Sequence, residues 1–138
     1  MQKLRSVQRR QYIPYSTHEP LPKNLQCRCL AKNIPILPGC VTPSEVAQAV
    51  KRGLKVVKFF PAEQAGGLAM IKAMAAPYHQ LKFMPTGGIN PNNLKEYLAF
   101  DKILCCGGSW MVKGELVKSG NFEKIKELTK EAKELAGI

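Results

Sequence analysis

Residues 54–63, Leu-Lys-Val-Val-Lys-Phe-Phe-Pro-Ala-Glu, form the stretch that decides the fold, a short apolar strand with a lysine inside it. Side chains alternate between the two faces of a strand, so Lys58 and Phe60 share one face while Val57 and Phe59 share the other. An apolar wall disfavours the ammonium form, lowers the lysine pKa and leaves a neutral amine that can condense with a carbonyl. This pattern predicts a Schiff-base lysine. The alternative is a strand-end lysine whose stem packs on apolar neighbours while its head reaches water.

The same unit of strand, glycine-bearing turn and helix recurs from residue 34 onward. Thr42-Pro43-Ser44-Glu45 has the pattern of a capping box with proline at the first helical position, so Glu45 is interpreted as a helix cap. Four strands alternating with helices predict an α/β protein with a parallel sheet. The strands are expected at 34–39, around Lys58, at 82–84 and at 103–106, and the helices at 42–53, 66–77, 90–98 and from about Asn121 to Leu135.

Two glycine-rich loops follow predicted strands, at 85–88 (Pro-Thr-Gly-Gly) and at 106–109 (Cys-Gly-Gly-Ser). The spacing of the units is typical of a (β/α)₈ barrel of the TIM type, which usually needs about 200–250 residues, whereas this chain has 138. In such barrels the chemistry lies at the carboxyl ends of the strands, and phosphate commonly binds after the last two strands. Both loops and Lys58 occupy such positions, so a phosphate site close to the lysine is predicted.

The net charge of +11 is unevenly distributed, because residues 1–33 contribute seven basic residues against one acidic residue. This segment also contains prolines that interrupt a possible strand at 11–16. We therefore divide the chain into a basic, poorly patterned segment, 1–33, and a barrel-like portion, 34–138. The charge has three interpretations: a solvated basic face, attraction of anionic substrates, or binding to nucleic acid. No interleaved aromatic residues or known nucleic-acid-binding motif accompany it, which disfavours the third.

Cysteine and histidine usage indicates neither a disulfide framework nor a metal site. Five cysteines are an odd number without paired C-x-x-C spacing, so free thiols in a reducing compartment are expected. His18 and His79 have no ligand partner at helical spacing, and no apolar run reaches bilayer length. These features favour a cytoplasmic protein without metal. Cys105 and Cys106 are expected in the strand core, and Trp110 is expected to serve in packing.

Four segments resemble a known enzyme family. They are Ile-Pro-Ile-Leu-Pro-Gly at 34–39, Val-Lys-Phe-Phe-Pro-Ala-Glu at 57–63, Phe-Met-Pro-Thr-Gly-Gly-Ile at 83–89 and Leu-Cys-Cys-Gly-Gly-Ser-Trp at 104–110. In order and spacing they are similar to the last four strands of 2-keto-3-deoxy-6-phosphogluconate (KDPG) aldolase, also known as 4-hydroxy-2-oxoglutarate (KHG) aldolase. The resemblance extends from about residue 33 to the end.

The resemblance implies a class I aldolase of the Entner-Doudoroff pathway, a carbon–carbon lyase that works as a trimeric barrel without metal or other cofactor. Its reaction cleaves the phosphorylated keto acid to pyruvate and glyceraldehyde 3-phosphate, with 4-hydroxy-2-oxoglutarate as a second substrate that gives pyruvate and glyoxylate. By this resemblance Lys58 is the Schiff-base lysine, Phe60 packs beside the imine and Thr86 lies near the pyruvate moiety. The phosphate end would be surrounded by Gly87, Gly88, Gly107, Gly108 and Ser109.

The chain departs from the family pattern before residue 33. Family members carry an E-V-T-L-R-type segment, with a glutamate as general acid/base and an arginine for the carboxylate, and a G-A-G-T-V strand, and neither is found here. Loss of the acid/base alone is expected to cost about 10²–10⁴-fold in rate. We therefore expect a truncated aldolase with only about the last four βα units. The alternatives are a catalytically inactive, phosphate-binding half-barrel and a basic nucleic-acid-associated fragment.

Overall fold

Short parallel strands form the centre of the structure. The computed structural model describes residues 15–17 and 28–138. Valine, isoleucine, tyrosine and phenylalanine, which favour strands, recur in its strand segments. These are β1 (Tyr15–Ser16), β2 (Ile36–Leu37), β3 (Val56–Phe59) and β4 (Lys82–Pro85).

The strands are neighbours in the order in which they occur in the chain. β1 pairs in parallel with β2, and β3 pairs in parallel with β4, where Lys58 lies opposite Met84. Isolated parallel bridges extend this arrangement, from Gly39 to Lys58 and, beyond β4, from Thr86 to Gly107. The parallel α/β arrangement expected from the sequence is confirmed.

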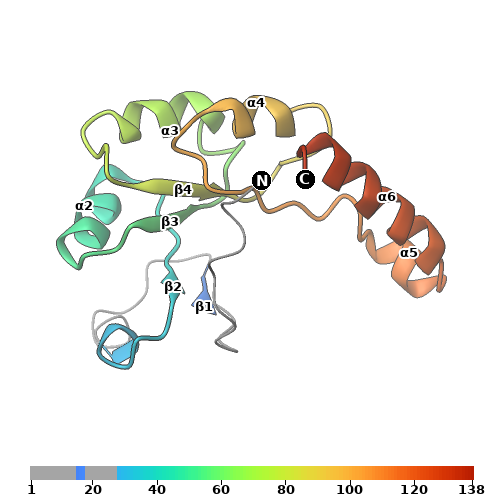
Figure 1. Cartoon of the computed structure of the whole chain (residues 1–138), viewed down its shortest axis with the longest axis horizontal. Coiled ribbons are helices and arrows are strands. Elements are labelled where there is room, and N and C mark those ends of the chain that lie inside the picture. Colours follow the sequence, from blue (N-terminus) through green and yellow to red (C-terminus); the bar gives the residue numbers. More distant parts are fainter. Residues whose placement is uncertain (1–14, 18–27) are drawn as a thin grey trace.

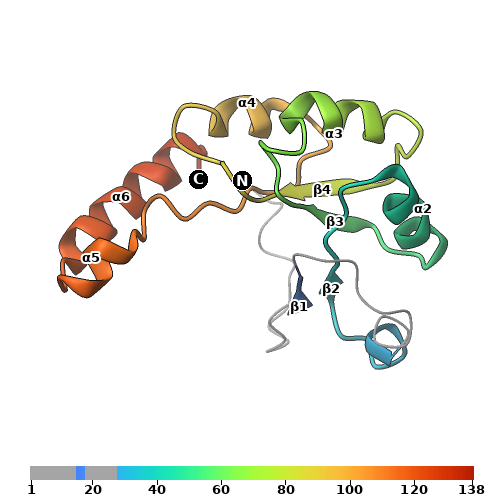
Figure 2. The same ribbon diagram turned by 180° about the vertical axis from the view of Figure 1, so that it is seen from behind.

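Helices follow the strands and cover one side of the central pair. Figure 1 and Figure 2 show α3 (Gly67–Ala75) and α4 (Leu94–Ala99) side by side over the same side of β3 and β4. The two short strands β1 and β2 lie away from these two helices. Further helices are α2 (Pro43–Lys51), α5 (Gly114–Lys118) and α6 (Phe122–Leu135), and residues 28–31 form a short helical turn.

The start of α2 is the predicted capping box. The Thr42 hydroxyl accepts a hydrogen bond from Glu45 N at 3.3 Å, and the Glu45 carboxylate accepts from Thr42 N at 2.8 Å and from Val41 N at 2.7 Å. Burial raises the pKa of Glu45, but these hydrogen bonds to the ionised form outweigh burial, and the pKa is lowered. The interpretation of Glu45 as a helix cap is confirmed.

The hydrophobic core lies between the central strands and the helices over them. Val57 and Phe59 of β3 and Phe83 of β4 are fully buried, and they belong to one cluster with Ile71 of α3. Because the strand alternates, Lys58 between Val57 and Phe59 points to the opposite face of β3. The core therefore holds β3 in place from one side while Lys58 is presented on the other.

The last segment of the sheet is less regular than predicted. The strand expected at 103–106 is reduced to one isolated bridge, between Ile103 and Phe83 of β4, and a second bridge follows it between Gly107 and Thr86, just beyond β4. Leu104 is 56% exposed and Cys105 is also exposed, so the prediction that Cys105 is a core residue is wrong. The physical reason is that, among the described residues, this segment has a strand neighbour on one side only.

The apolar stripe of α6 is covered only near its end. Phe122 is 65% exposed, Ala132 is buried, and Leu135 and Ala136 pack against the core. Figure 1 shows why, because α5 and α6 project from the rest of the molecule and return toward it only at the C-terminus. The helix itself was predicted from about Asn121, which is its N-cap, whereas α5 was not predicted.

Of the possible strand at 11–16, the structure describes only β1; residues 11–14 lie outside the described residues, so the interruption by prolines stays a prediction. Tyr15–Ser16 pairs with β2, and Thr17 continues the contact, since its N–H donates to the Leu37 carbonyl at 3.3 Å. The Thr17 hydroxyl accepts from Gly39 N at 3.3 Å. Much of the basic segment lies outside the described residues, so its division from the barrel-like portion at residue 33 stays a prediction.

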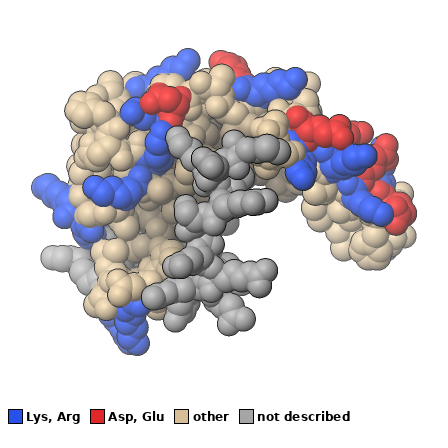
Figure 3. Space-filling view, viewed as in Figure 1, with Lys and Arg blue, Asp and Glu red and all other residues tan. Residues whose placement is uncertain are grey.

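Charged side chains are dispersed over the surface. Figure 3 shows lysine and arginine at several separate places on the visible face, with basic and acidic groups alternating along the projecting α5 and α6. On α6, Lys124 contacts Glu127 at 2.8 Å and Lys126 contacts Glu123 at 3.7 Å. Of the helices the structure describes, none is long and apolar enough to cross a bilayer. On this face (Figure 3) the described lysine and arginine side chains stand in separate places and do not form one continuous basic stripe of the kind that nucleic-acid binding favours.

Candidate active site

Lys58 lies within β3 and is almost fully buried, with 5% of its surface exposed. Main-chain hydrogen bonds hold it in place, because its N–H donates to the Pro38 carbonyl at 2.9 Å and its carbonyl accepts from Cys40 N at 2.8 Å. Burial lowers the pKa of the Lys58 amine, in the direction expected from the sequence. This burial disfavours the alternative of a lysine whose head reaches water.

Phe60 is the aromatic neighbour of the amine. The Lys58 Nζ atom lies 5.4 Å from the centre of the Phe60 ring. That distance permits a cation–π interaction when the amine is charged and an apolar contact when it is neutral. The ring therefore connects Lys58 with the cavity described next, which Phe60 also lines.

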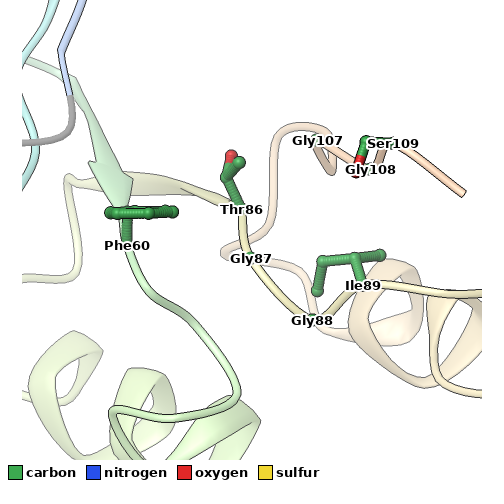
Figure 4. A pocket seen from close by; sticks show the side chains of 8 residues that line it. All are labelled: Phe60, Thr86, Gly87, Gly88, Ile89, Gly107, Gly108 and Ser109. Carbon is green, nitrogen blue, oxygen red and sulfur yellow. The ribbon is translucent and has the colours of Figure 1, made fainter. Parts of the chain in front are cut away.

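A cavity of about 360 Å³ opens where the two glycine-rich loops meet. The loops are adjacent because Thr86 and Gly107 form a parallel bridge, in which Gly107 N donates to the Pro85 carbonyl at 2.9 Å. Figure 4 shows Phe60 on one side, the Gly107–Ser109 loop on the other and the Thr86 side chain between them. The cavity is lined by Phe60, Thr86, Gly87, Gly88, Ile89, Gly107, Gly108 and Ser109.

Glycine is required in both loops by close approach or by backbone conformation. A Cβ atom on Gly107 would lie 2.6 Å from Thr86 Oγ1, and one on Gly108 would lie 1.9 Å from Cζ3 of Trp110. Gly88 has a φ of +82°, which side chains rarely adopt. At these glycines the loops therefore present main-chain atoms to the cavity without an intervening Cβ atom.

Main-chain donors in these loops are available to a bound anion. Among the described residues the structure shows no acceptor for the N–H groups of Gly88, Gly108 or Ser109. The buried hydroxyl oxygen of Thr86 is likewise without a hydrogen-bond partner in that part of the chain. Convergent backbone N–H groups favour phosphate or carboxylate oxygens, so the cavity is chemically suited to an anionic ligand.

The predicted site residues thus fall into two connected places. Phe60, Thr86 and the five glycine-loop residues line one cavity, whereas Lys58 is not among its lining residues and meets it through Phe60. The sequence did not single out Ile89, which is 5% exposed and also lines the cavity. Its position directly after a Gly-Gly pair was the only available signal.

Among the described residues, no acidic side chain lines the cavity. Glu45 is engaged at the start of α2, and Glu63 accepts a hydrogen bond from the Tyr97 hydroxyl. Burial, and then the Glu63 carboxylate, raise the pKa of Tyr97, which keeps its phenol protonated as the donor. Both acids near the predicted site therefore have structural partners.

The cysteines do not add a reactive or metal-binding group. Burial, followed by the charge of Glu45, raises the pKa of Cys40 to about 12. Burial, followed by the neighbouring Cys105, raises the pKa of Cys106 to about 12. In residues 15–17 and 28–138 no three His, Cys, Asp or Glu side chains gather as a metal site would require. The described cysteines are free thiols, and Cys27 lies outside the described residues.

Several known proteins similar to this chain are named for the same activity. The family model for KDPG and KHG aldolase matches residues 18–128. A 2-dehydro-3-deoxy-phosphogluconate aldolase of Treponema pallidum (strain Nichols) is 44% identical over 110 residues, which are 80% of this chain and 52% of that protein.

Solved structures give the same result. KDPG aldolase from Legionella pneumophila, with pyruvate captured at low pH as a covalent carbinolamine intermediate, matches with a TM-score of 0.77 and 39% identity over 82% of this chain and 54% of that one. The aldolase of Zymomonas mobilis ZM4 with 3-phosphoglycerate matches with a TM-score of 0.76 and 37% identity, covering 86% and 55% of the two chains. This chain spans about half the length of the relatives it matches.

Proposed function

This chain belongs to the KDPG and KHG aldolase family, and from that premise we propose that it supplies the Schiff-base part of a class I aldolase active site. The reaction is cleavage of 2-keto-3-deoxy-6-phosphogluconate to pyruvate and glyceraldehyde 3-phosphate. 4-Hydroxy-2-oxoglutarate, which would give pyruvate and glyoxylate, is the second substrate. The observation that carries the proposal is the buried Lys58 amine, which has a lowered pKa and lies beside Phe60 at the edge of the glycine-lined cavity.

The chemistry begins at Lys58. Its neutral amine attacks the C2 carbonyl carbon of the keto acid and forms a carbinolamine, which loses water to give a protonated imine. The C3–C4 bond then breaks, and its electron pair is delocalised into the imine as an enamine. The C4 hydroxyl gives its proton to a water molecule, because no carboxylate of the described residues lines the cavity, and it becomes the aldehyde that leaves. Protonation at C3 and hydrolysis of the imine release pyruvate and the free amine.

The glycine loops are proposed to hold the other end of the substrate. Thr86 is placed near the pyruvate moiety, while Gly87, Gly88, Gly107, Gly108 and Ser109 surround the phosphate. Support comes from the cavity that these residues line and from the available N–H groups of Gly88, Gly108 and Ser109. A phosphate oxygen interacts favourably with several convergent N–H groups, and glycines allow it to approach them.

Residues 34–138 are proposed to form the last four βα units of a (β/α)₈ barrel. The consecutive parallel segments support this, as does the match to about half of each solved relative. A second candidate function is phosphate binding without turnover, favoured by the absence of an acidic side chain from the described residues lining the cavity. A trimer, as the family resemblance implies, is proposed for the assembled enzyme and is testable by light scattering.

Borohydride trapping with pyruvate tests the proposed function. Borohydride reduces an imine to a stable secondary amine, so peptide mass mapping is expected to find the pyruvate adduct on Lys58. Lys58→Ala should abolish labelling. Lys55→Ala is the matched control, because Lys55 is an exposed lysine adjacent to the same strand, and its loss should leave labelling unchanged.

Each outcome distinguishes the candidates. An adduct on Lys58 without measurable cleavage of KDPG would support the binding candidate and would show that proton transfer is missing. Labelling spread over exposed lysines, or none at Lys58, would exclude the Schiff-base role of this chain.

A further inference from the structure

The buried Tyr97 and the exposed Glu63 form a partly buried hydrogen bond that the proposed chemistry does not use. Tyr97, in the middle of α4, is 2% exposed, and its hydroxyl donates to Glu63 Oε1 across 34 positions of sequence. Glu63 lies in the turn after β3. A Cβ atom on Gly67 would approach both Glu63 Oε1 and the Tyr97 hydroxyl at 3.3 Å, so the first residue of α3 packs against the pair. The pair therefore links the turn after β3 with α3 and α4.

The stem of Glu63 lies directly against Gly88. A Cβ atom on Gly88 would be 2.4 Å from Glu63 Cγ and 2.6 Å from Glu63 Cβ. The two turns are also joined by their main chains, because Glu63 N donates to the Gly87 carbonyl at 3.1 Å and Ala62 N donates to the Thr86 carbonyl at 2.9 Å. The turn after β3 thus forms the support on which the loop after β4 rests.

Gly88 is held from a second direction by the start of the next helix. Its carbonyl accepts from Asn90 Nδ2 at 3.0 Å and from Asn93 Nδ2 at 3.1 Å. Asn93 Oδ1 in turn accepts from Asn90 N at 2.9 Å. The carbonyl of Gly88 is therefore directed at the asparagine amides while its α-carbon rests on Glu63. The two asparagines thus fix the peptide group that follows Gly88, through its carbonyl. The available Gly88 N–H belongs to the peptide group that precedes Gly88, so it is oriented through the same α-carbon.

We propose that Glu63 and Tyr97 are positioning residues for the anion-binding loop: the Tyr97 hydrogen bond immobilises the Glu63 side chain, and Glu63 sets the place of the Gly88 N–H in the cavity. Neither residue lines the cavity, so neither touches the ligand. The inference rests on the proposed function only in taking the anion to be a phosphate group. Under this proposal, Schiff-base formation depends on Lys58, whereas phosphate affinity depends on Glu63 and Tyr97, and the two can be altered separately.

The experiment is a titration of the full chain, labelled with ¹⁵N, with inorganic phosphate, followed through the amide resonances of Gly88 and Ser109. Wild type should show saturable shifts of both. Tyr97→Phe, which removes only the hydroxyl, should raise the half-saturating phosphate concentration roughly tenfold, on the scale of one hydrogen bond to a charged acceptor. Glu63→Gln, which retains an oxygen to accept from Tyr97, should bind phosphate close to wild type. Glu63→Ala, which removes this acceptor, should bind phosphate more weakly.

Two controls separate positioning from general loosening. Tyr78→Phe removes a hydroxyl outside the site and should leave phosphate binding unchanged. Borohydride trapping of Lys58 with pyruvate, which has no phosphate group, should reach half-saturation at the same pyruvate concentration in Tyr97→Phe as in wild type. A variant in which both phosphate binding and pyruvate trapping weaken in parallel would overturn the inference.

The inference would also be overturned by wild-type resonances that do not respond to phosphate, or by Tyr97→Phe binding phosphate like wild type. Failure of wild type to trap pyruvate, together with the expected phosphate results, would refute the aldolase function of this chain and support the positioning role. The two proposals therefore fail separately.

Discussion

Replacement of Gly108 by alanine is expected to displace Trp110 and destabilise the chain. A Cβ atom on Gly108 would lie 1.9 Å from Cζ3 and 2.4 Å from Cε3 of Trp110. Ordinary contact begins at 3.4 Å, so the ring or the loop must move by at least 1.5 Å, the difference between 3.4 and 1.9 Å. Insertion of a methyl group into a well-packed core typically costs about 1–3 kcal/mol. Gly108 is exposed and Trp110 is half-buried, so a cost at the lower end of this range is expected.

Trp110 makes this prediction easy to measure, because it is the only tryptophan of the chain. Gly108→Ala should change the tryptophan emission spectrum of the folded protein and lower the free energy of unfolding in urea by about 1 kcal/mol, the lower end of that range. Gly114→Ala is the matched control, since a Cβ atom there would meet nothing within 4 Å. The control should retain the wild-type emission.

A double-mutant cycle then tests the cause. In a Trp110→Ala background, followed by circular dichroism, Gly108→Ala should lose most of its cost, because the ring that it displaces is gone. The reasoning would be refuted if Gly108→Ala had wild-type emission and stability, or if its cost persisted without Trp110.

Three further predictions concern the strand lysine, the first helix and the core. The folded-state pKa of Lys58 lies below its ordinary value of 10.5. As the pH rises, the folded chain therefore loses the ammonium proton of Lys58 at a lower pH than the unfolded chain does. The free energy of unfolding should therefore increase as pH rises from the folded pKa to 10.5, and Lys58→Met should remove that increase in urea titrations at a series of pH values. Thr42→Ala should cost about 1 kcal/mol in the same assay, through loss of the helix cap, and an unchanged value would contradict the capping role. Phe83→Ala should cost about 3–5 kcal/mol, because the ring is fully buried between β4 and the helices. A loss of less than 1 kcal/mol, well below that range, would mean that this ring is not part of the packed core.

Features governed by neighbouring residues were predictable from the sequence. The capping box at Thr42 and Glu45, the alternation around Lys58 and the turns after β3 and β4 depend on residues a few positions apart, so their patterns are visible in a single segment. The same holds for the lowered pKa of Lys58, because valine and phenylalanine on either side of a strand lysine already predict burial.

Features that depend on distant partners were not predictable in the same way. The exposure of Cys105 and Phe122 depends on which elements lie beside them, and no local pattern reports that. The pairing of Tyr15–Ser16 with β2 likewise required a partner about twenty positions away. A two-residue strand has too few residues for a periodic signal, so only its pairing reveals it.

The sequence by itself determined the family resemblance, the parallel α/β arrangement and the burial of Lys58 in a strand, because glycine turns, helix caps and strand alternation are local consequences of residue type. Only the tertiary structure brought Gly88 and Ser109 to one cavity, set the stem of Glu63 against Gly88 and connected it to Tyr97. These contacts join residues that are separated along the chain. Their formation depends on the packing of α3 and α4 over β3 and β4, and packing is a property of the whole chain and is absent from any single segment.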